Sequence, residues 1–163
     1  MLLALLSDSH DNAPSIQAAL AIFRPHHPAA YLHAGDLVDP AMLAHFAGLA
    51  PFHFVFGNNE YDHAALRAVA SSLNLHCHGE LADLTFAGKR LAMLHGDDDV
   101  LFSKLVRSGD YAYVIHGHTH VRHDTRVGNT RIISPGALHR AQPRSVALLD
   151  VTTDNLQFLD LPS

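Results

Sequence analysis

Short apolar runs that end abruptly in polar residues recur along the chain. Five of them share this form, and each is followed within a few positions by Asp, Asn or His. They are residues 2–6, 29–33, 52–56, 90–94 and 111–115. A continuous apolar run of this length is typical of a strand buried on both faces. The pattern therefore predicts inner strands whose carboxyl ends open into polar loops.

Helical periodicity separates several of these runs. In residues 14–24, Ile16, Ala19, Leu20 and Phe23 lie at the i, i+3, i+4 and i+7 positions of one face, and Pro14 suits a first turn. Residues 40–46, 63–73 and 100–106 show a similar pattern. Strands that alternate with helices predict an α/β fold with a largely parallel core.

The pattern changes after residue 120 to short strand-like segments around turn residues. Segments 125–127 and 131–134 flank Gly128 and Asn129, and segments 145–152 and 156–161 flank residues 153–155. Each pair predicts a hairpin. We therefore expect an α/β fold of two packed mixed β-sheets flanked by helices, an αββα sandwich, built as a single domain over residues 1–163.

Composition narrows the class of protein. A chain of 163 residues that is 48% hydrophobic can bury a full core. The net charge of -5 leaves no basic surface for extended nucleic acid. The apolar run at residues 1–6 has no basic flank and is shorter than a signal core of roughly 7–15 residues or a spanning helix of about 20. We expect a cytoplasmic protein that does not bind a membrane.

Cysteine and histidine usage points to one kind of metal site. Cys77 is the single cysteine, so an intrachain disulfide and a thiolate-rich zinc site are excluded, and we expect Cys77 to be a small buried side chain. The 15 histidines outnumber the 11 Lys and Arg residues, and histidine is the commonest metal ligand. Seven lie in no ligand-like pattern and are expected to be surface or packing residues: His26, His27, His45, His53, His63, His76 and His78.

Polar residues from the ends of the predicted strands should meet at one edge of the sheet, where ligands bind in open α/β folds. The residues concerned are Asp8, Asp36, Asn58, His95 and His118. Carboxylate and amide oxygens mixed with imidazole suit Mn, Fe, Zn or Ni. Two such ions roughly 3.5–4 Å apart can bridge a carboxylate and a water, lower the pKa of that water and clamp phosphoryl oxygens. Phosphoryl transfer needs little beyond this positioning and charge neutralisation.

These residues stand in a recognisable series of short motifs. In order they are Asp8-Ser9-His10, Gly35-Asp36, Gly57-Asn58-Asn59-Glu60, His95-Gly96 and Gly117-His118-Thr119-His120, with Ser134-Pro135-Gly136 after them. The series resembles the D-x-H, G-D, G-N-x-[DE], H-G, G-H-T-H and N-P-G blocks of the calcineurin-like metallophosphoesterases. The short length resembles the small bacterial and archaeal phosphodiesterase branch of that family.

The resemblance implies a role for each position. Asp8, His10 and His120 would hold one metal ion. Asn58, His95 and His118 would hold the other, and Asp36 would bridge the two. The activity implied is metal-dependent hydrolysis of a small phosphate ester, with a diester favoured, by a water that two divalent ions activate. The metal expected is Mn, with Ni, Fe, Zn or Co as alternatives, and self-association into a homo-oligomer is left open.

Three departures from the family pattern bear on substrate and proton delivery. Asn59 stands where many relatives have a histidine that protonates the leaving group; it is the candidate catalytic residue, but an amide can only donate a hydrogen bond. Asp97 follows His95-Gly96 where histidine is common, and Ser134 replaces asparagine. His123 is a substitute candidate acid.

Neighbours of the motifs have expected supporting roles. Glu60 is expected to orient its loop rather than to bind metal. His33 and His116 flank the ligand motifs and are expected either to support the ligands or to be buried core residues.

Two other classes of function are alternatives to a phosphoesterase. The same fold occurs in a eukaryotic sorting-complex subunit that acts as a scaffold, so the alternative is a non-catalytic metal-binding or protein-interaction module. All seven ligand positions are intact in this chain, which favours an enzyme. A single-metal hydrolase of carbon esters would have no use for seven ligands.

Overall fold

The computed structural model describes residues 1–49 and 51–162. Its first sheet has the order β11-β10-β1-β2-β3-β4. The strands are β1 (Leu2–Leu6), β2 (Ala30–His33), β3 (Phe52–Phe54), β4 (His76–Cys77), β10 (Ser145–Asp150) and β11 (Asn155–Asp160). β1 to β4 pair in parallel, whereas β10 pairs antiparallel with both β1 and β11. The sheet is therefore mixed, with its parallel half carrying the N-terminal motifs.

The second sheet has the order β5-β6-β7-β9-β8. Its strands are β5 (Leu81–Phe86), β6 (Lys89–Leu94), β7 (Tyr113–Ile115), β8 (His123–Val127) and β9 (Thr130–Ser134). β6, β7 and β9 are parallel, and β5 and β8 close the two sides as antiparallel partners. This sheet is mixed as well, which confirms the predicted architecture.

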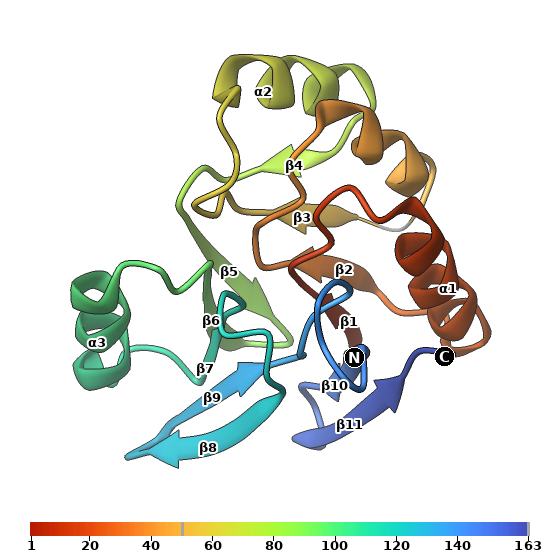
Figure 1. The fold of residues 1–163 in the computed structure, drawn as a ribbon. Helices are drawn as coiled ribbons and strands as arrows, with labels where there is room; N and C mark the ends of the chain where they lie inside the picture. The colour runs from red at the N-terminus through yellow and green to blue at the C-terminus, as the bar shows by residue number, and fades with distance from the viewer. Residues whose placement is uncertain (50, 163) are drawn as a thin grey trace.

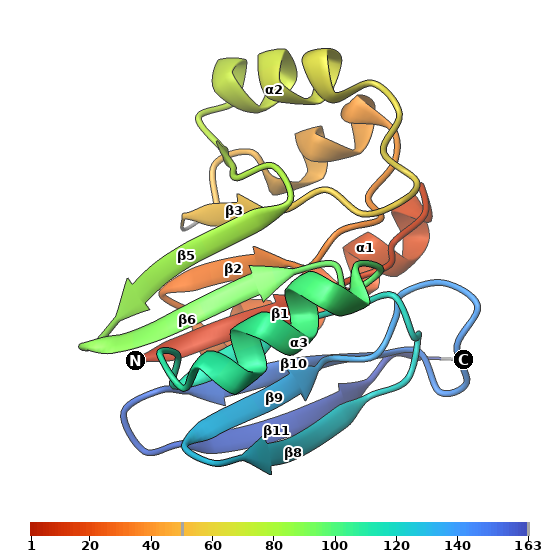
Figure 2. The same cartoon turned by 90° about the vertical axis from the view of Figure 1, so that its left-hand side faces the viewer.

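Alternation along the strands builds three apolar layers. Leu3 and Leu5 of β1 pack between the two sheets, while Ala4 and Leu6 face α1 (Ala13–Phe23), α2 (His63–Ser72) and the 3-10 segment η2 (Pro40–Phe46). A third layer joins the outer face of the second sheet to α3 (Asp99–Ser108). Figures 1 and 2 show these helices on the outsides of the paired sheets. The result is the αββα sandwich that the sequence pattern predicts.

The helices begin at polar residues that satisfy their free amides. Asn12, Asp62 and Asp98 each accept a hydrogen bond from an amide in the first turn, at the starts of α1, α2 and α3. A short 3-10 turn, η1 (Arg24–His26), continues α1. Because these caps lie directly after the strand-end loops, they also set where the loops end.

The observed elements differ from the predicted ones in detail. Residues 40–46 form a 3-10 segment, and the strand expected over residues 52–56 ends at Phe54. β4 and β5 were not predicted, since β4 has only two residues and β5 is half exposed with mixed polarity. Within the described residues, no helix is long and apolar enough to cross a membrane.

Candidate metal and phosphoester site

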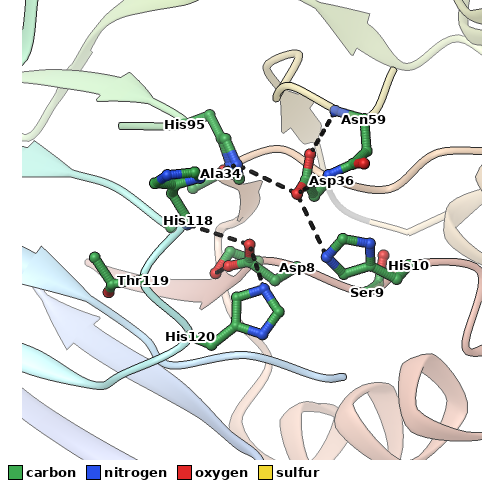
Figure 3. A network of polar contacts seen from close by, with 12 residues as sticks. Asp8, Ser9, His10, Ala34, Asp36, Asn59, His95, His118, Thr119 and His120 are labelled. Atoms are coloured by element: carbon green, nitrogen blue, oxygen red, sulfur yellow. Dashed lines mark hydrogen bonds and ion pairs between the residues drawn. The ribbon is translucent and has the colours of Figure 1, made fainter. Parts of the chain in front are cut away.

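Loops from β1, β2, β3, β6 and β7 meet at one edge of the two sheets (Figure 3). Backbone hydrogen bonds join them: the amide of Asp8 donates to Gly35 O at 3.0 Å, that of His10 to Asp36 O at 2.9 Å and that of Gly117 to His95 O at 2.8 Å. The loops are thus fixed to one another by main-chain contacts.

Asp8 lies at one centre of the site. Its side chain is fully buried, and its Oδ1 is 3.3 Å from His120 Nε2 and accepts a hydrogen bond from the His118 amide at 3.1 Å. Donor atoms of Asp8, His10 and His120 all lie within 4.8 Å of one another. These are the three residues that the resemblance assigns to one metal ion.

Asp36 lies between the two predicted ligand sets. Its Oδ2 is 3.4 Å from His10 Nε2 and 3.3 Å from His95 Nε2, so one carboxylate oxygen contacts a histidine of each set. Asn59 donates from Nδ2 to the same oxygen at 2.8 Å and from its backbone amide to Oδ1 at 3.0 Å. Asp8, Asp36 and His95 form a second group with donor atoms within 4.8 Å.

Asn58, His95 and His118 meet on the other side of Asp36. Asn58 Oδ1 is 3.1 Å from both His95 Nε2 and His118 Nδ1, and these two ring nitrogens are 3.3 Å apart. The second ring nitrogen of His95, Nδ1, donates to Ala34 O at 2.9 Å, which leaves Nε2 unprotonated in the neutral ring. The structure therefore brings all seven predicted ligand residues to one place.

Backbone conformation singles out the same residues. Five of the seven have positive φ although none is glycine: Asp8 (53°), His10 (42°), Asp36 (57°), His118 (67°) and His120 (58°). Residues other than glycine rarely adopt the left-handed region of backbone conformation. Where they do, the strained residue commonly lies at a functional site. The segment from His118 to His120 is accordingly bent and not extended, with left-handed backbone at both histidines.

Glycines beside the ligands allow close approach. A Cβ on Gly117 would lie 2.7 Å from Asp8 Oδ2, and a Cβ on Gly57 would lie 2.8 Å from both the Asp36 amide and His95 Cδ2. Both positions therefore exclude any side chain. The Gly-Asn and Gly-His motifs are explained by this packing.

Glu60 ties two of the loops together. Its carboxylate accepts hydrogen bonds from the amides of Gly57 at 2.7 Å, Asp36 at 3.2 Å and Val38 at 3.1 Å, and also from the amide of Leu37. The side chain is 4% exposed. These contacts confirm that Glu60 orients the loops that carry Asp36 and Asn58.

The electrostatics of the site favour bound cations. Burial raises the pKa of Asp8. Burial would also raise the pKa of Asp36, but hydrogen bonds from His95 and Asn59 hold it below its ordinary value. Burial opposes a charge on His95, yet contact with Asp36 raises its pKa to about 9. Two buried carboxylates therefore draw positive charge toward them.

A buried nitrogen without a hydrogen-bond partner also supports the binding of metal ions at this site. His10 Nε2 is buried and, within the described part of the chain, has no hydrogen-bond partner, although it lies 3.4 Å from Asp36 Oδ2. Imidazole nitrogen facing carboxylate oxygen is the donor set that first-row divalent ions prefer. The residues present therefore fit divalent metal ions.

Other predicted residues lie at the border of the site. His33 is fully buried, and its Nε2 contacts Ser9 Oγ at 3.0 Å, so it supports the loop after β1. His116 is buried and donates from Nδ1 to Gly117 O at 3.1 Å. Burial lowers the pKa of His33 to about 3 and that of His116 to about 4. His123 lies on exposed β8, next to His116.

His139 also lies at the border of the site, although no sequence motif pointed to it. Its ring centroid is 5.4 Å from that of His10, which in turn is 5.3 Å from that of His120. His139 follows the Ser134-Pro135-Gly136 turn. The turn is held to the loop after β1, because Ser7 Oγ donates to Gly136 O at 2.7 Å. That contact between distant segments has no signal in the local sequence.

The sandwich fold and this cluster of aspartate, asparagine and histidine at its strand ends define a phosphoesterase domain. The chain belongs to the calcineurin-like phosphoesterase superfamily, because the family model described as "Calcineurin-like phosphoesterase superfamily domain" matches residues 1–154. The family resemblance of the sequence motifs is confirmed.

Individual relatives place the chain near small archaeal enzymes. A phosphodiesterase from Methanocaldococcus jannaschii is 29% identical in an alignment of 143 residues that covers 83% of this chain and 83% of that protein. A solved structure of an archaeal phosphodiesterase superposes with a TM-score of 0.92 at 25% identity and covers 99% of this chain and 100% of that one.

More distant structures share the fold alone. A phosphoesterase from E. coli superposes with a TM-score of 0.70 at 16% identity over 99% of this chain and all of that one. Vps29 from Entamoeba histolytica, solved with Zn, gives 0.70 at 19% identity over 98% and 99% of the two chains.

Proposed function

We propose that this protein is a metal-dependent phosphodiesterase with two divalent ions per chain. The observation that carries the proposal is Asp36, whose Oδ2 contacts one histidine from each predicted ligand set. Asp8, His10 and His120 would hold one ion, and Asn58, His95 and His118 the other. Asp36 would bridge them. Manganese is the proposed metal, with Ni, Fe, Zn or Co as alternatives.

Bound divalent ions would supply a water of lowered pKa and would neutralise the phosphoryl oxygens. The chain's own groups do the positioning. Asn59 holds both oxygens of Asp36, and Glu60 fixes the loops on either side. This rigid support matters because a small misplacement of reacting groups costs a large factor in rate.

The substrate class proposed is a small phosphate diester. The support is the family, together with similarity to two archaeal proteins described as phosphodiesterases. The net charge of -5 gives no support for binding along extended nucleic acid. We also propose that residues 1–163 act as one domain.

The test is a hydrolysis assay on metal-stripped protein. Bis(4-nitrophenyl) phosphate and 4-nitrophenyl phosphate are supplied with Mn, Co, Ni, Zn or Fe in turn. We expect hydrolysis of the diester with Mn, loss of activity with a chelator and recovery when Mn is returned. His10→Ala should reduce the rate by at least about 100-fold, since loss of a ligand disrupts a metal site.

The matched control is His26→Ala, because His26 is exposed in η1 and belongs to none of the motifs. It should keep the wild-type rate. Absence of hydrolysis with all five metals would contradict the proposed phosphodiesterase activity and would favour the scaffold function instead.

A further inference from the structure

A hollow of about 370 Å³ opens beside His120. Figure 3 shows His120 and His95 on opposite sides of Asp8. Its walls come from two segments, residues 119–122 and residues 140–143. Arg122, Arg140 and Gln142 supply the polar groups besides His120 and Thr119, and no lining residue is acidic. The positive charge of this arginine hollow comes from Arg140, because Arg122 is ion-paired with Asp160, and it lies on a protein of net negative charge.

The two arginines differ in how they are held. Arg122 donates from Nη1 to Asp160 at 2.6 Å and lies 5.8 Å from the Phe158 ring, so its guanidinium is fixed in place. Arg140 makes no ion pair or side-chain hydrogen bond within the described part of the chain. Its charge is available to a ligand.

Backbone geometry ties Arg140 to the phosphoester site. Arg140 has a φ of 48°, a strained conformation for a residue with a side chain. The residue before it, His139, packs against His10 with ring centroids 5.4 Å apart. The guanidinium is thus carried by a segment that is anchored on a proposed metal ligand.

The other side of the site has the opposite charge. A hollow of about 190 Å³ next to His95 is lined by Glu80, Asp97 and Asp98, with Phe56 as an apolar wall. Asp98 also caps α3. A ligand that carries a negative group on one arm would be repelled there and attracted to the arginine hollow.

We propose that Arg140, assisted by Arg122, binds a second anionic group of the substrate. The inference rests on the proposed phosphoesterase function and names its substrate class: a phosphate ester that carries a further phosphate or carboxylate on one of its alcohols. The arginine hollow receives that group, while the ester phosphate lies at the cluster of Asp8, Asp36 and His95. Arg140 is then a specificity-determining residue and takes no part in bond cleavage.

The test is equilibrium binding by calorimetry, which needs no turnover. Three probes are compared at constant ionic strength: 2-hydroxyethyl phosphate with one anionic group, ethylene glycol bisphosphate with two phosphates, and phosphoglycolate with a phosphate and a carboxylate. We expect the wild type to bind at least one two-anion probe about tenfold more tightly than 2-hydroxyethyl phosphate. Comparison of ethylene glycol bisphosphate with phosphoglycolate shows whether the arginine hollow prefers phosphate or carboxylate.

Arg140→Gln should abolish that preference and leave the affinity for 2-hydroxyethyl phosphate unchanged. Arg107→Gln on α3 is the control and should change neither value. An equal preference in wild type and Arg140→Gln, or no preference in the wild type, would overturn the inference. The hydrolysis assay is independent, so its failure would count against the phosphoesterase function and not against this anion site.

Discussion

Asn59 holds both carboxylate oxygens of Asp36, from its side-chain amide at 2.8 Å and its backbone amide at 3.0 Å. From the sequence, Asn59 is predicted to donate a hydrogen bond to the leaving group, and that role remains a prediction. The structure adds a positioning contact to the residue proposed to bridge the two metal ions. The two roles are compatible, because a side-chain amide carries two donor hydrogens and Asp36 takes one of them.

The leaving-group role predicts a steep dependence of rate on leaving-group pKa. Asn59 can give a hydrogen bond but no proton, so nitrophenolate should depart readily and alkoxides slowly. Asn59→His should selectively speed diesters with alkyl leaving groups, by up to the factor of about 10² to 10⁴ typical of a general acid. The measurement is kcat over a series of diesters with graded leaving groups.

Asn59→Ala serves as the control for positioning. It should slow every diester, because Asp36 loses a hydrogen bond whatever the leaving group is. It should also steepen the dependence on leaving-group pKa, because the leaving group loses its hydrogen bond as well. A flat dependence in the wild type that Asn59→His leaves unchanged would show that protonation comes from another group or does not limit the rate.

Glu60 should contribute strongly to stability as well as to geometry. Both carboxylate oxygens of Glu60 accept hydrogen bonds from backbone amides. In Glu60→Gln one oxygen becomes an NH2 group, which cannot accept, so the amides on that side lose their acceptor. Loss of hydrogen bonds to a buried charged group should lower the free energy of unfolding by about 2 kcal/mol. Urea denaturation followed by circular dichroism measures this. Glu80→Gln, at an exposed position, should change it by less than about 0.5 kcal/mol.

A histidine stack away from the site predicts how stability depends on pH. The ring of His53 stacks on those of His76 and His78, and its Nδ1 lies 2.9 Å from His78 Nε2. Burial, followed by the nearby charges of His76 and His78, lowers the pKa of His53 from 6.5 to about 4. The unfolded chain therefore takes up a proton first, and stability is lost as pH falls from about 6.5 toward 4.

His53→Phe removes that titration while keeping an aromatic ring in the stack. Between pH 7 and pH 4.5, the urea concentration at the midpoint of unfolding should fall less in the variant than in the wild type. Wild type and variant would be followed side by side in the same buffers. An identical fall in the two proteins would rule out a contribution from His53.

Sequence patterns predicted the strand ends well because they combine two strong signals. A fully buried strand must be apolar, and a ligand at its end must be polar, so positions such as Asp8 and Asp36 stand out against their neighbours. Glycine before Asn58 and before His118 marks close backbone approach, which the packing at Gly57 and Gly117 explains. These features are local, and local features are visible in one sequence.

Features that depend on distant segments were not predictable. His139 and Arg140 reach the site only because the turn before them is bonded to the loop after β1. His53, His76 and His78 were expected only to be surface or packing residues, and their stacking arises from the pairing of β3 with β4. β4 and β5 were missed because a short or half-exposed strand has little apolar pattern.

The central claim is that two divalent ions bind at one cluster with Asp36 between them. Metal content per chain, measured by elemental analysis after saturation with Mn and removal of free metal, tests it most directly. We predict two ions in the wild type and in the control Asp110→Asn, about one in His10→Ala, and fewer than one in Asp36→Asn, since the bridging ligand serves both ions. No more than one ion per chain in the saturated wild type, or equal single-ion losses in His10→Ala and Asp36→Asn, would contradict the account.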